Sequence, residues 1–136
     1  MGKLKDDTVK TIKQVVVFKA SPHDVYEALI DSEKHQKFSG SKAVISREVG
    51  GKFIAYDGYI EGRNLILLKD RKIVQSWRGN DWPKGVYSKV IFSLVKIKGG
   101  TKMTFTQTGV PSKNCRDIKQ GWIDYYWKPM KDMLEK

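Results

Sequence analysis

The chain has 136 residues, of which 40% are hydrophobic and 30% charged, a composition that favours a packed fold and excludes disorder as the main state. Its single cysteine, Cys115, excludes an intramolecular disulfide and a zinc site built from several cysteines. No apolar run approaches the ~18 residues that a membrane span needs, so we expect a cytoplasmic protein without membrane insertion. We expect one domain over residues 1–136, with residues 1–10 frayed.

Lysine and arginine outnumber aspartate and glutamate by 26 to 15, and the excess lies in the second half of the chain. Residues 1–68 carry eleven basic and nine acidic side chains, a net charge of +2, whereas residues 69–136 carry fifteen and six, a net charge of +9. One interpretation is a docking face for an acidic protein surface, a nucleic acid or lipid headgroups. The other is a solvated, lysine-rich surface that keeps a small domain soluble.

Two short helices are expected near the N-terminus. Ser21 is a good N-cap and Asp24 can complete a capping box with it, which predicts a helix over 22–30. A second helical turn, capped by Ser32, is expected over 33–38.

Short β-branched and aromatic segments bounded by turn residues predict an antiparallel sheet rather than βαβ units. The expected strands are residues 11–19, 42–46, 52–56, 59–68, 72–78, 87–98 and 101–109. Backbone freedom for tight turns is available at three glycine-containing pairs, Gly50-Gly51, Asp57-Gly58 and Gly99-Gly100.

From residue 112 onward the hydrophobic period lengthens to about 3.6 residues, which predicts a long amphipathic helix with Trp122 on its apolar arc. Pro129 removes one backbone donor and clashes with the carbonyl of Tyr125, so we expect a kink or break near Lys128. This order of elements predicts an α+β fold in which the long helix covers one face of a curved antiparallel sheet. Such packing can leave a cavity between the two layers.

Catalytic signatures are absent from the sequence. Neither His23 nor His35 has a His, Cys or carboxylate partner at metal-ligand spacing, and we expect both on exposed helix surfaces. Cys115 is expected to be an ordinary thiol without a histidine partner. The chain contains no GxSxG, HExxH, Walker A or GxGxxG motif. We therefore expect no enzyme, no bound metal and no cofactor.

Seven aromatic residues are candidates for lining a ligand cavity between sheet and helix: Phe38, Phe53, Trp77, Phe92, Phe105, Trp122 and Tyr126. The alternative is that they form ordinary core. Gln75 shares one strand face with Ile73 and Trp77, which fits either a sheet edge or a polar-lined pocket.

Three segments together carry a recognisable pattern: KIVQSWRGNDWPKGVYSKVIFSL (72–94), GGTKMTFTQTGVP (99–111) and GWIDYYWKPMKDMLEK (121–136). The earlier ASPHDVYEALID (20–31), the phenylalanine at position 38 and GGKF (50–53) fit the same pattern. From about Thr11 onward the chain thus resembles the C-terminal-type domain of the activator of the heat-shock protein 90 ATPase. The resemblance implies the helix-grip fold of the START-like superfamily, a curved antiparallel sheet around a long C-terminal helix.

The family's two-domain members bind heat-shock protein 90 and accelerate its ATP hydrolysis, and their separate N-terminal domain has no counterpart in these 136 residues. Our first hypothesis is therefore a non-catalytic, chaperone-associated binding module that docks on heat-shock protein 90 or another acidic protein surface. Trp82 and Lys84, in the loop between residues 78 and 86, are candidates for partner contact. The alternative for Trp82 is that it closes one end of the sheet as part of the core.

Two other functions stay open at this point. A START-like carrier or sensor would hold a small apolar ligand between the sheet and the C-terminal helix. The net charge would also support salt-sensitive, sequence-indifferent association with nucleic acid, but we expect no specific nucleic-acid partner.

Overall fold

The computed structural model describes residues 9–136 as a seven-stranded sheet with helices packed on one of its faces. The elements in chain order are β1 (Val9–Phe18), α1 (Pro22–Ile30), α2 (Ser32–Ser39), β2 (Val44–Ile45), β3 (Lys52–Ala55), the 3₁₀ turn η2 (Tyr56–Gly58), β4 (Ile60–Leu68), β5 (Lys72–Gly79), β6 (Ser88–Ile97), β7 (Gly100–Pro111), α3 (Ser112–Trp122), the π-helical turn η3 (Ile123–Trp127) and α4 (Lys128–Leu134). Residues 1–8, which include most of the segment expected to fray, lie outside the described residues.

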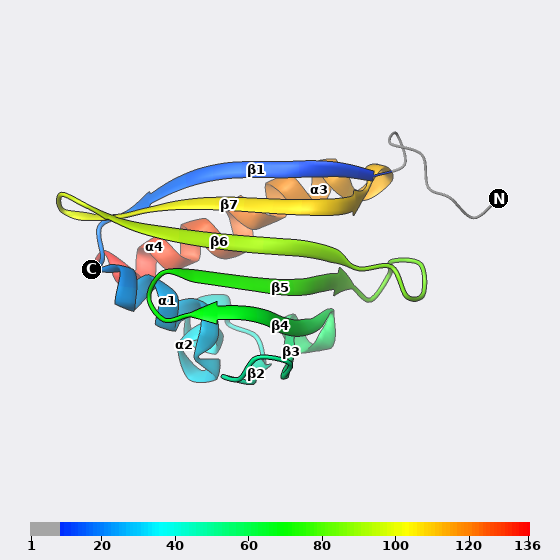
Figure 1. Ribbon diagram of the computed structural model, residues 1–136, viewed down its shortest axis with the longest axis horizontal. Coiled ribbons are helices and arrows are strands. Elements are labelled where there is room, and N and C mark those ends of the chain that lie inside the picture. The colour runs from blue at the N-terminus through cyan, green and yellow to red at the C-terminus, as the bar shows by residue number, and fades with distance from the viewer. Residues whose placement is uncertain (1–8) are drawn as a thin grey trace.

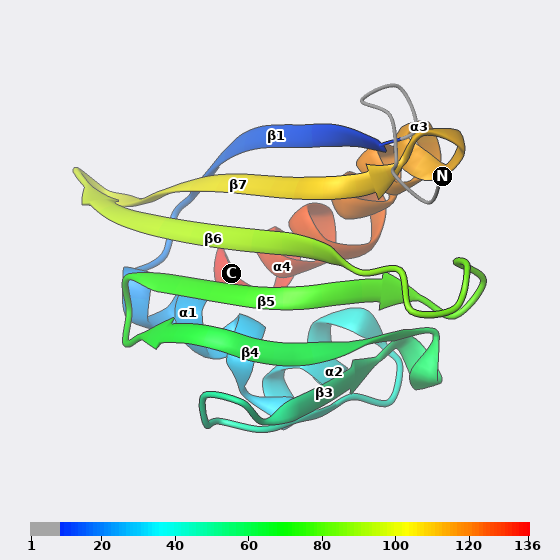
Figure 2. The same ribbon diagram turned by 45° about the vertical axis from the view of Figure 1, so that its right-hand side comes forward.

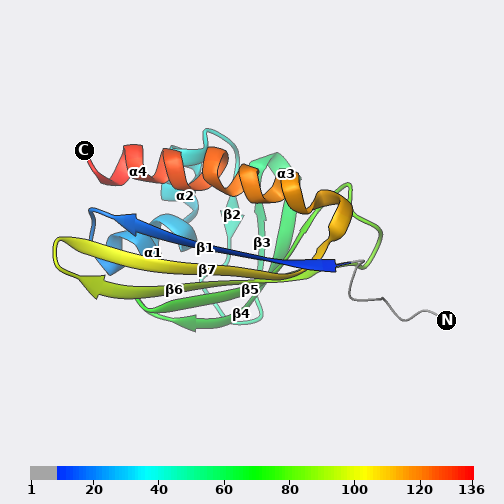
Figure 3. The ribbon, with the colours of Figure 1, turned by 90° about the horizontal axis from the view of Figure 1, so that it is seen from above.

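Every pair of neighbouring strands is antiparallel, in the order β1-β7-β6-β5-β4-β3-β2 (Figure 1). β1 pairs with β7 because the chain leaves the first strand through α1 and α2 before it builds the meander from β2 to β7. The twist of the sheet is visible in Figure 2, and Figure 3 shows the C-terminal helix lying along one face. The expected α+β, helix-grip architecture is confirmed.

The two short helices begin with side-chain caps. The Oγ of Ser21 accepts a hydrogen bond from the backbone N–H of Asp24 at 3.1 Å, as the capping-box pattern predicts. The prediction for the second helix was wrong by one residue: α2 begins at Ser32, and its cap is Asp31, whose Oδ2 accepts from the N–H of Lys34 at 3.0 Å. Ser32 instead uses its hydroxyl to accept a hydrogen bond from the N–H of Ile45 in β2 at 2.8 Å.

Each expected strand forms, with ends that differ from expectation by at most two residues, and two of these differences are described here. The strand expected over 42–46 is reduced to β2, two residues long. β1 starts at Val9, so the fraying expected for residues 9 and 10 is wrong; Val9 pairs with Pro111 and Lys10 with Val110. The glycine turns are confirmed, with φ of +84° at Gly50, +93° at Gly58 and +81° at Gly99, values that glycine adopts without a Cβ penalty.

The C-terminal helix does not break at Pro129. A π-helical turn precedes the proline: the N–H of Lys128 bonds to the carbonyl of Ile123, five residues back. Lys128 keeps right-handed helical angles, φ −63° and ψ −53°, and Figure 3 shows α3, η3 and α4 as one continuous rod. The wider turn replaces the expected kink because it rearranges the hydrogen bonds next to a residue that has no N–H.

Candidate functional site

The seven aromatic candidates for a ligand cavity are all buried, with at most 8% of any side chain exposed. They pack on one another: the ring centroids of Phe105 and Trp122 lie 4.4 Å apart, as do those of Trp122 and Tyr126. The space left among Phe53, Trp122 and their neighbours is about 10 Å³, which is the volume of a single water. These residues therefore form a filled core, except that Trp77, Trp122 and Tyr126 also line the open pocket described below.

Polar groups inside this core bond to one another. The indole N–H of Trp122 donates to Oε1 of Gln107 at 2.7 Å, and the Gln107 amide donates to the Ser88 hydroxyl at 2.9 Å. Gln75 lies inside the sheet, not at its edge; its amide donates to Oδ1 of Asn64 at 2.9 Å. Both glutamines are thus explained as satisfied core residues.

One histidine expectation was wrong. His35 is only 3% exposed, and its ring centroid lies 4.6 Å from that of Phe38 and 5.4 Å from that of Tyr126. Burial lowers the pKa of His35 to about 4, and its Nδ1 has no hydrogen-bond partner among the described residues. The sequence did contain a signal for the burial of His35. Positions 35 and 38 share one helix face, and residue 38 is the apolar residue of that helix.

His23 does lie on the surface, as expected, with 54% of its side chain exposed. Its Nδ1 is 2.9 Å from Oδ1 of Asp70, a partner far away in sequence that no spacing argument finds. No group of three or more His, Cys, Asp or Glu residues within 9–136 could hold a metal ion. Within the same range, no helix is both long and apolar enough to cross a membrane.

The two candidates for partner contact both lie in the loop after β5, but their environments differ. Trp82 is 4% exposed and its ring centroid lies 5.5 Å from that of Trp77, which favours the core alternative for this residue. Lys84 is exposed at the loop surface. Arg78 holds the loop in place, because its Nη2 donates to the carbonyl of Trp82 at 2.6 Å and its Nε to that of Val86 at 3.2 Å.

An open pocket of about 380 Å³ lies between the C-terminal helix and the ends of β4 and β5. Six aromatic residues line it: Tyr56, Tyr59, Trp77, Trp122, Tyr125 and Tyr126. Asp81, Asn114 and Asp117 supply the polar part of the wall. The Tyr59 hydroxyl donates to Oδ1 of Asp81 at 2.9 Å, and burial together with this carboxylate raises the pKa of Tyr59 to about 12.

The face of the sheet opposite the helices, here called the outer face, is basic. Directly paired residues of antiparallel strands project to the same face. Lys72 pairs with Ser93 and Lys102 with Val95, so both lysines lie on the face opposite the buried Phe92. The register places one basic side chain from each of six strands on the outer face: Lys13, Lys102, Lys89, Lys72, Arg63 and Lys52.

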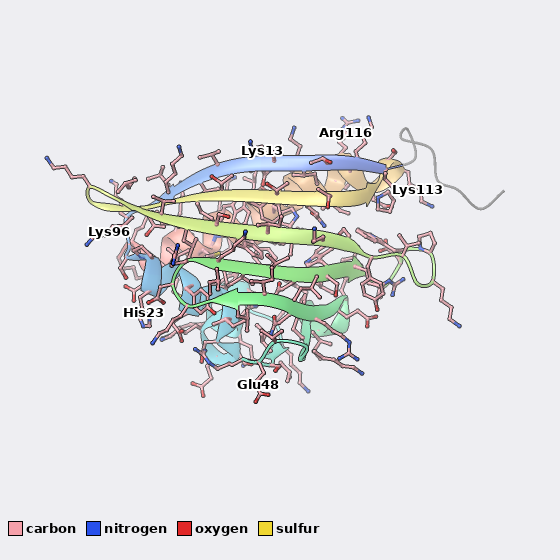
Figure 4. The ribbon with its side chains drawn as sticks, viewed as in Figure 1. Lys13, His23, Glu48, Lys96, Lys113 and Arg116 are labelled. Atoms are coloured by element: carbon pink, nitrogen blue, oxygen red, sulfur yellow. The ribbon has the colours of Figure 1, made fainter. Side chains whose placement is uncertain are left out.

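The outer face carries little negative charge. The described strands contain one acidic residue, Glu61, whose Oε2 lies 3.3 Å from Nη1 of Arg78. Apolar side chains lie between the cations and are 44–60% exposed: Val15, Val17, Ile66, Leu68 and Val95. In Figures 1 and 4 the helices lie behind the sheet, so the outer face is toward the viewer, with Lys13 on its edge strand and Lys96 near the β6–β7 turn.

Comparison with known proteins gives consistent matches. The family model for "Activator of Hsp90 ATPase homolog 1-like protein" matches residues 19–135. Over 119 residues the chain is 38% identical to the activator of 90 kDa heat shock protein ATPase homolog of Dictyostelium discoideum, covering 87% of this chain and 31% of that protein. It is 34% identical over 119 residues to homolog 2 of Mus musculus, covering 88% and 36%. The chain thus spans about a third of the length of these relatives.

Among solved structures, a crystal structure of an HSP90 activator from Plasmodium falciparum superposes with a TM-score of 0.86. It is 26% identical in sequence, and the match covers 92% of this chain and 96% of that chain. The fold described above is therefore shared with a protein that is named as an HSP90 activator.

Proposed function

We propose that this chain, which belongs to the Activator of Hsp90 ATPase homolog 1-like family, is a cytoplasmic, non-catalytic module that binds heat-shock protein 90 and stimulates its ATPase activity. The observation that carries the proposal is the 38% identity to a named activator over 87% of the chain. The relatives are about three times longer than this chain. The activity named for the whole relative is therefore proposed here for a chain that matches about a third of it.

The outer face is the surface that we assign to docking. Six basic side chains, besides Arg78, face away from the helices, and the described strands oppose them with a single carboxylate, Glu61, which already pairs with Arg78. An acidic partner surface would be attracted over about 8 Å at physiological salt, and the exposed valines and leucines between the lysines would then lose contact with water. A hollow of about 460 Å³ on this face is lined by Lys52, Arg63 and Tyr87, and also by Glu61, whose carboxylate lies 3.3 Å from Nη1 of Arg78.

Transport or sensing of an apolar ligand enclosed in the aromatic core itself, away from the open pocket of about 380 Å³, is not favoured. The space among the core aromatic residues is about 10 Å³, whereas ligand cavities are ordinarily of about 300–1,000 Å³. A carrier of this kind would need the rings of Trp122 and Tyr126, now 4.4 Å apart, to separate.

The decisive experiment is a titration of heat-shock protein 90 from the source organism with the full chain, in which ATP hydrolysis and binding are measured at low and at physiological salt. We expect stimulation that weakens as salt rises. Lys89→Glu/Lys102→Glu reverses two charges on the outer face and should lower the affinity by about tenfold or more at low salt.

A matched control keeps the change in net charge the same and moves it elsewhere. Lys34→Glu/Lys37→Glu reverses two exposed lysines on α2 and should leave the affinity within about twofold of wild type. Absence of binding at low salt would refute the function itself. Equal losses in both double variants would refute the outer face as the docking surface while leaving chaperone binding intact.

A further inference from the structure

β1 is one edge of the sheet, and no further strand of residues 9–136 lies on its free side. The strand order places β7 on one side of β1 and nothing on the other. Figure 3 looks onto this edge, and the C-terminal helix lies beside β1 without crossing it. An edge strand presents N–H and C=O groups that can pair with the backbone of another extended chain. The opposite edge offers much less backbone, because β2 has two residues.

The regular part of the β1 edge is long enough to pair with a short strand. The register of β1 against β7 shifts between Lys10 and Ile12 and then runs without a break from Ile12 to Phe18. Within this stretch Val15 and Val17 lie on the outer face and are 56% and 47% exposed. Branched side chains at alternate positions form a surface against which the side chains of a neighbouring strand pack.

The border of the molecule along this edge is basic. Lys13 is exposed on the strand, and Lys113 and Arg116 are exposed on α3. α3 lies beside β1, because the side-chain amide of Gln14 donates to the carbonyl of Lys119 at 3.0 Å. Figure 4 shows Lys13 and Arg116 along this border. Within residues 9–136 none of these three exposed cations forms an ion pair with a carboxylate.

This distribution of charge favours one kind of occupant over another. β1 contains two lysines, Lys10 and Lys13, and no acidic residue. Two copies of the chain that joined through β1 would bring these lysines together from both sides, and like charges oppose such a pair. An extended peptide that carries carboxylates would instead be attracted by the strand and by α3.

We infer that the free edge of β1 binds an extended acidic peptide of a partner protein, which adds a strand to the sheet. The backbone of residues 12–18 supplies the hydrogen bonds. Carboxylates on the helix side of the peptide meet Lys113 and Arg116, and apolar side chains on its other side pack beside Val15 and Val17. The edge is distinct from the outer face, although Lys13 borders both, and the inference does not depend on chaperone binding.

The probe for this edge is the capped peptide Val-Glu-Val-Glu-Val-Glu-Val-Glu. Its binding to the full chain is followed by NMR, through chemical shifts and through the exchange of backbone amide hydrogens. We expect shift changes and slower amide exchange within residues 12–18, and no such change at β2 on the opposite edge. Binding should weaken as salt rises.

Two control peptides separate the addition of a strand from attraction between charges alone. The same sequence with a methyl group on every backbone nitrogen keeps its carboxylates but has no N–H donors, and it should bind at least about tenfold more weakly. The peptide in which lysine replaces each glutamate keeps its backbone donors, and the basic border should prevent its binding.

Two double variants of the chain test the position of the site. Lys13→Glu/Arg116→Glu reverses two charges at the edge and should weaken binding of the acidic peptide about tenfold at low salt. Lys52→Glu/Lys89→Glu makes the same change in net charge on strands that do not pair with β1, and should leave the affinity within about twofold of wild type.

The inference is overturned if the methylated peptide binds as tightly as its parent, if both double variants lose affinity equally, or if the amides of β1 exchange as fast with the peptide as without it. Slow exchange in β1 without any peptide, in a chain that is dimeric at the same concentration, would also overturn it and would assign the edge to a second copy.

Discussion

The hydroxyl of Tyr56 donates a hydrogen bond to the backbone carbonyl of Tyr125 and so ties the β3–β4 turn to the C-terminal helix. In an α-helix that carbonyl would accept from the N–H of residue 129, which here is a proline without one. Burial raises the pKa of the Tyr56 phenol, and the neighbouring phenol of Tyr125 adds to the shift. The neutral hydroxyl, a good donor, is thus the stable form at every ordinary pH.

The first prediction follows from the hydrogen bond between Tyr56 and the carbonyl of Tyr125. Tyr56→Phe removes the donor and should lower the free energy of unfolding by about 1 kcal/mol, measured by urea denaturation. In a Pro129→Ala background an N–H at position 129 can serve the carbonyl, so the same substitution should cost less. Equal costs in the two backgrounds would show that the hydroxyl does not compensate for the proline.

The second prediction follows from the buried polar chain in the core. Gln107 is fully buried and accepts from Trp122 while donating to Ser88, whose hydroxyl in turn donates to the carbonyl of Trp77 at 2.8 Å. Gln107→Ala leaves the indole N–H without a partner and opens a cavity, so we expect a loss of about 3 kcal/mol of stability.

Exposed Gln120→Ala is the matched control for this loss. Gln120 donates to Asp124 on the helix surface at 3.1 Å, and its removal should change stability by no more than about 0.5 kcal/mol. Similar midpoints in urea for wild type and Gln107→Ala would mean that the internal chain of hydrogen bonds contributes little.

Local patterns in the sequence predict the elements of this fold well, because caps, turns and periodicity are determined by near neighbours. Ser21 caps α1, and Gly50 and Gly99 adopt positive φ where turns were expected. The π turn before Pro129 was missed, because several hydrogen-bond arrangements can accommodate a proline, and the observed one is accompanied by a contact with Tyr56. That contact joins residues 69 positions apart.

The sites depend on register and tertiary packing, which explains why the sequence predicts them less well. The basic outer face appears only once Lys72 is known to lie beside Ser93 and Lys102 beside Val95. The positive half of the chain was visible in the composition, but its concentration on one face was not. The pocket likewise brings Asp81 and Asp117 together from a loop and a helix, and no spacing in the sequence connects them.

The third prediction concerns pH. His35 is neutral in the fold, with a pKa of about 4 against 6.5 in the unfolded chain, so the unfolded state binds more protons between these values. Stability is therefore complete above about pH 6.5 and falls as the pH drops toward 4. The rings of Phe38, Tyr56 and Tyr126 surround the imidazole and offer no negative charge that would offset protonation.

We expect this histidine to account for about 3 kcal/mol of the lost stability between pH 6.5 and 4. The measurement is a series of urea denaturation curves at several pH values for wild type and His35→Leu. The difference in unfolding free energy between the two proteins should move in favour of the leucine variant as the pH falls. A difference that stays constant with pH would show that the pKa of His35 is the same in the folded and the unfolded chain, so that burial does not lower it.

The fourth prediction separates packing from docking in the loop after β5. Trp82→Ala removes a ring that is 4% exposed and lies against Trp77, so we expect a loss of about 3 kcal/mol in stability. Lys84→Ala, two residues further on and exposed, should leave stability within about 0.5 kcal/mol and weaken chaperone binding at low salt. Thermal denaturation and the binding titration on both variants give the comparison. Unchanged stability in Trp82→Ala together with lost binding would instead make the indole a direct contact. Its burial against Trp77 argues against this outcome. A partner would first have to open the loop, which Arg78 holds by a hydrogen bond to the carbonyl of Trp82.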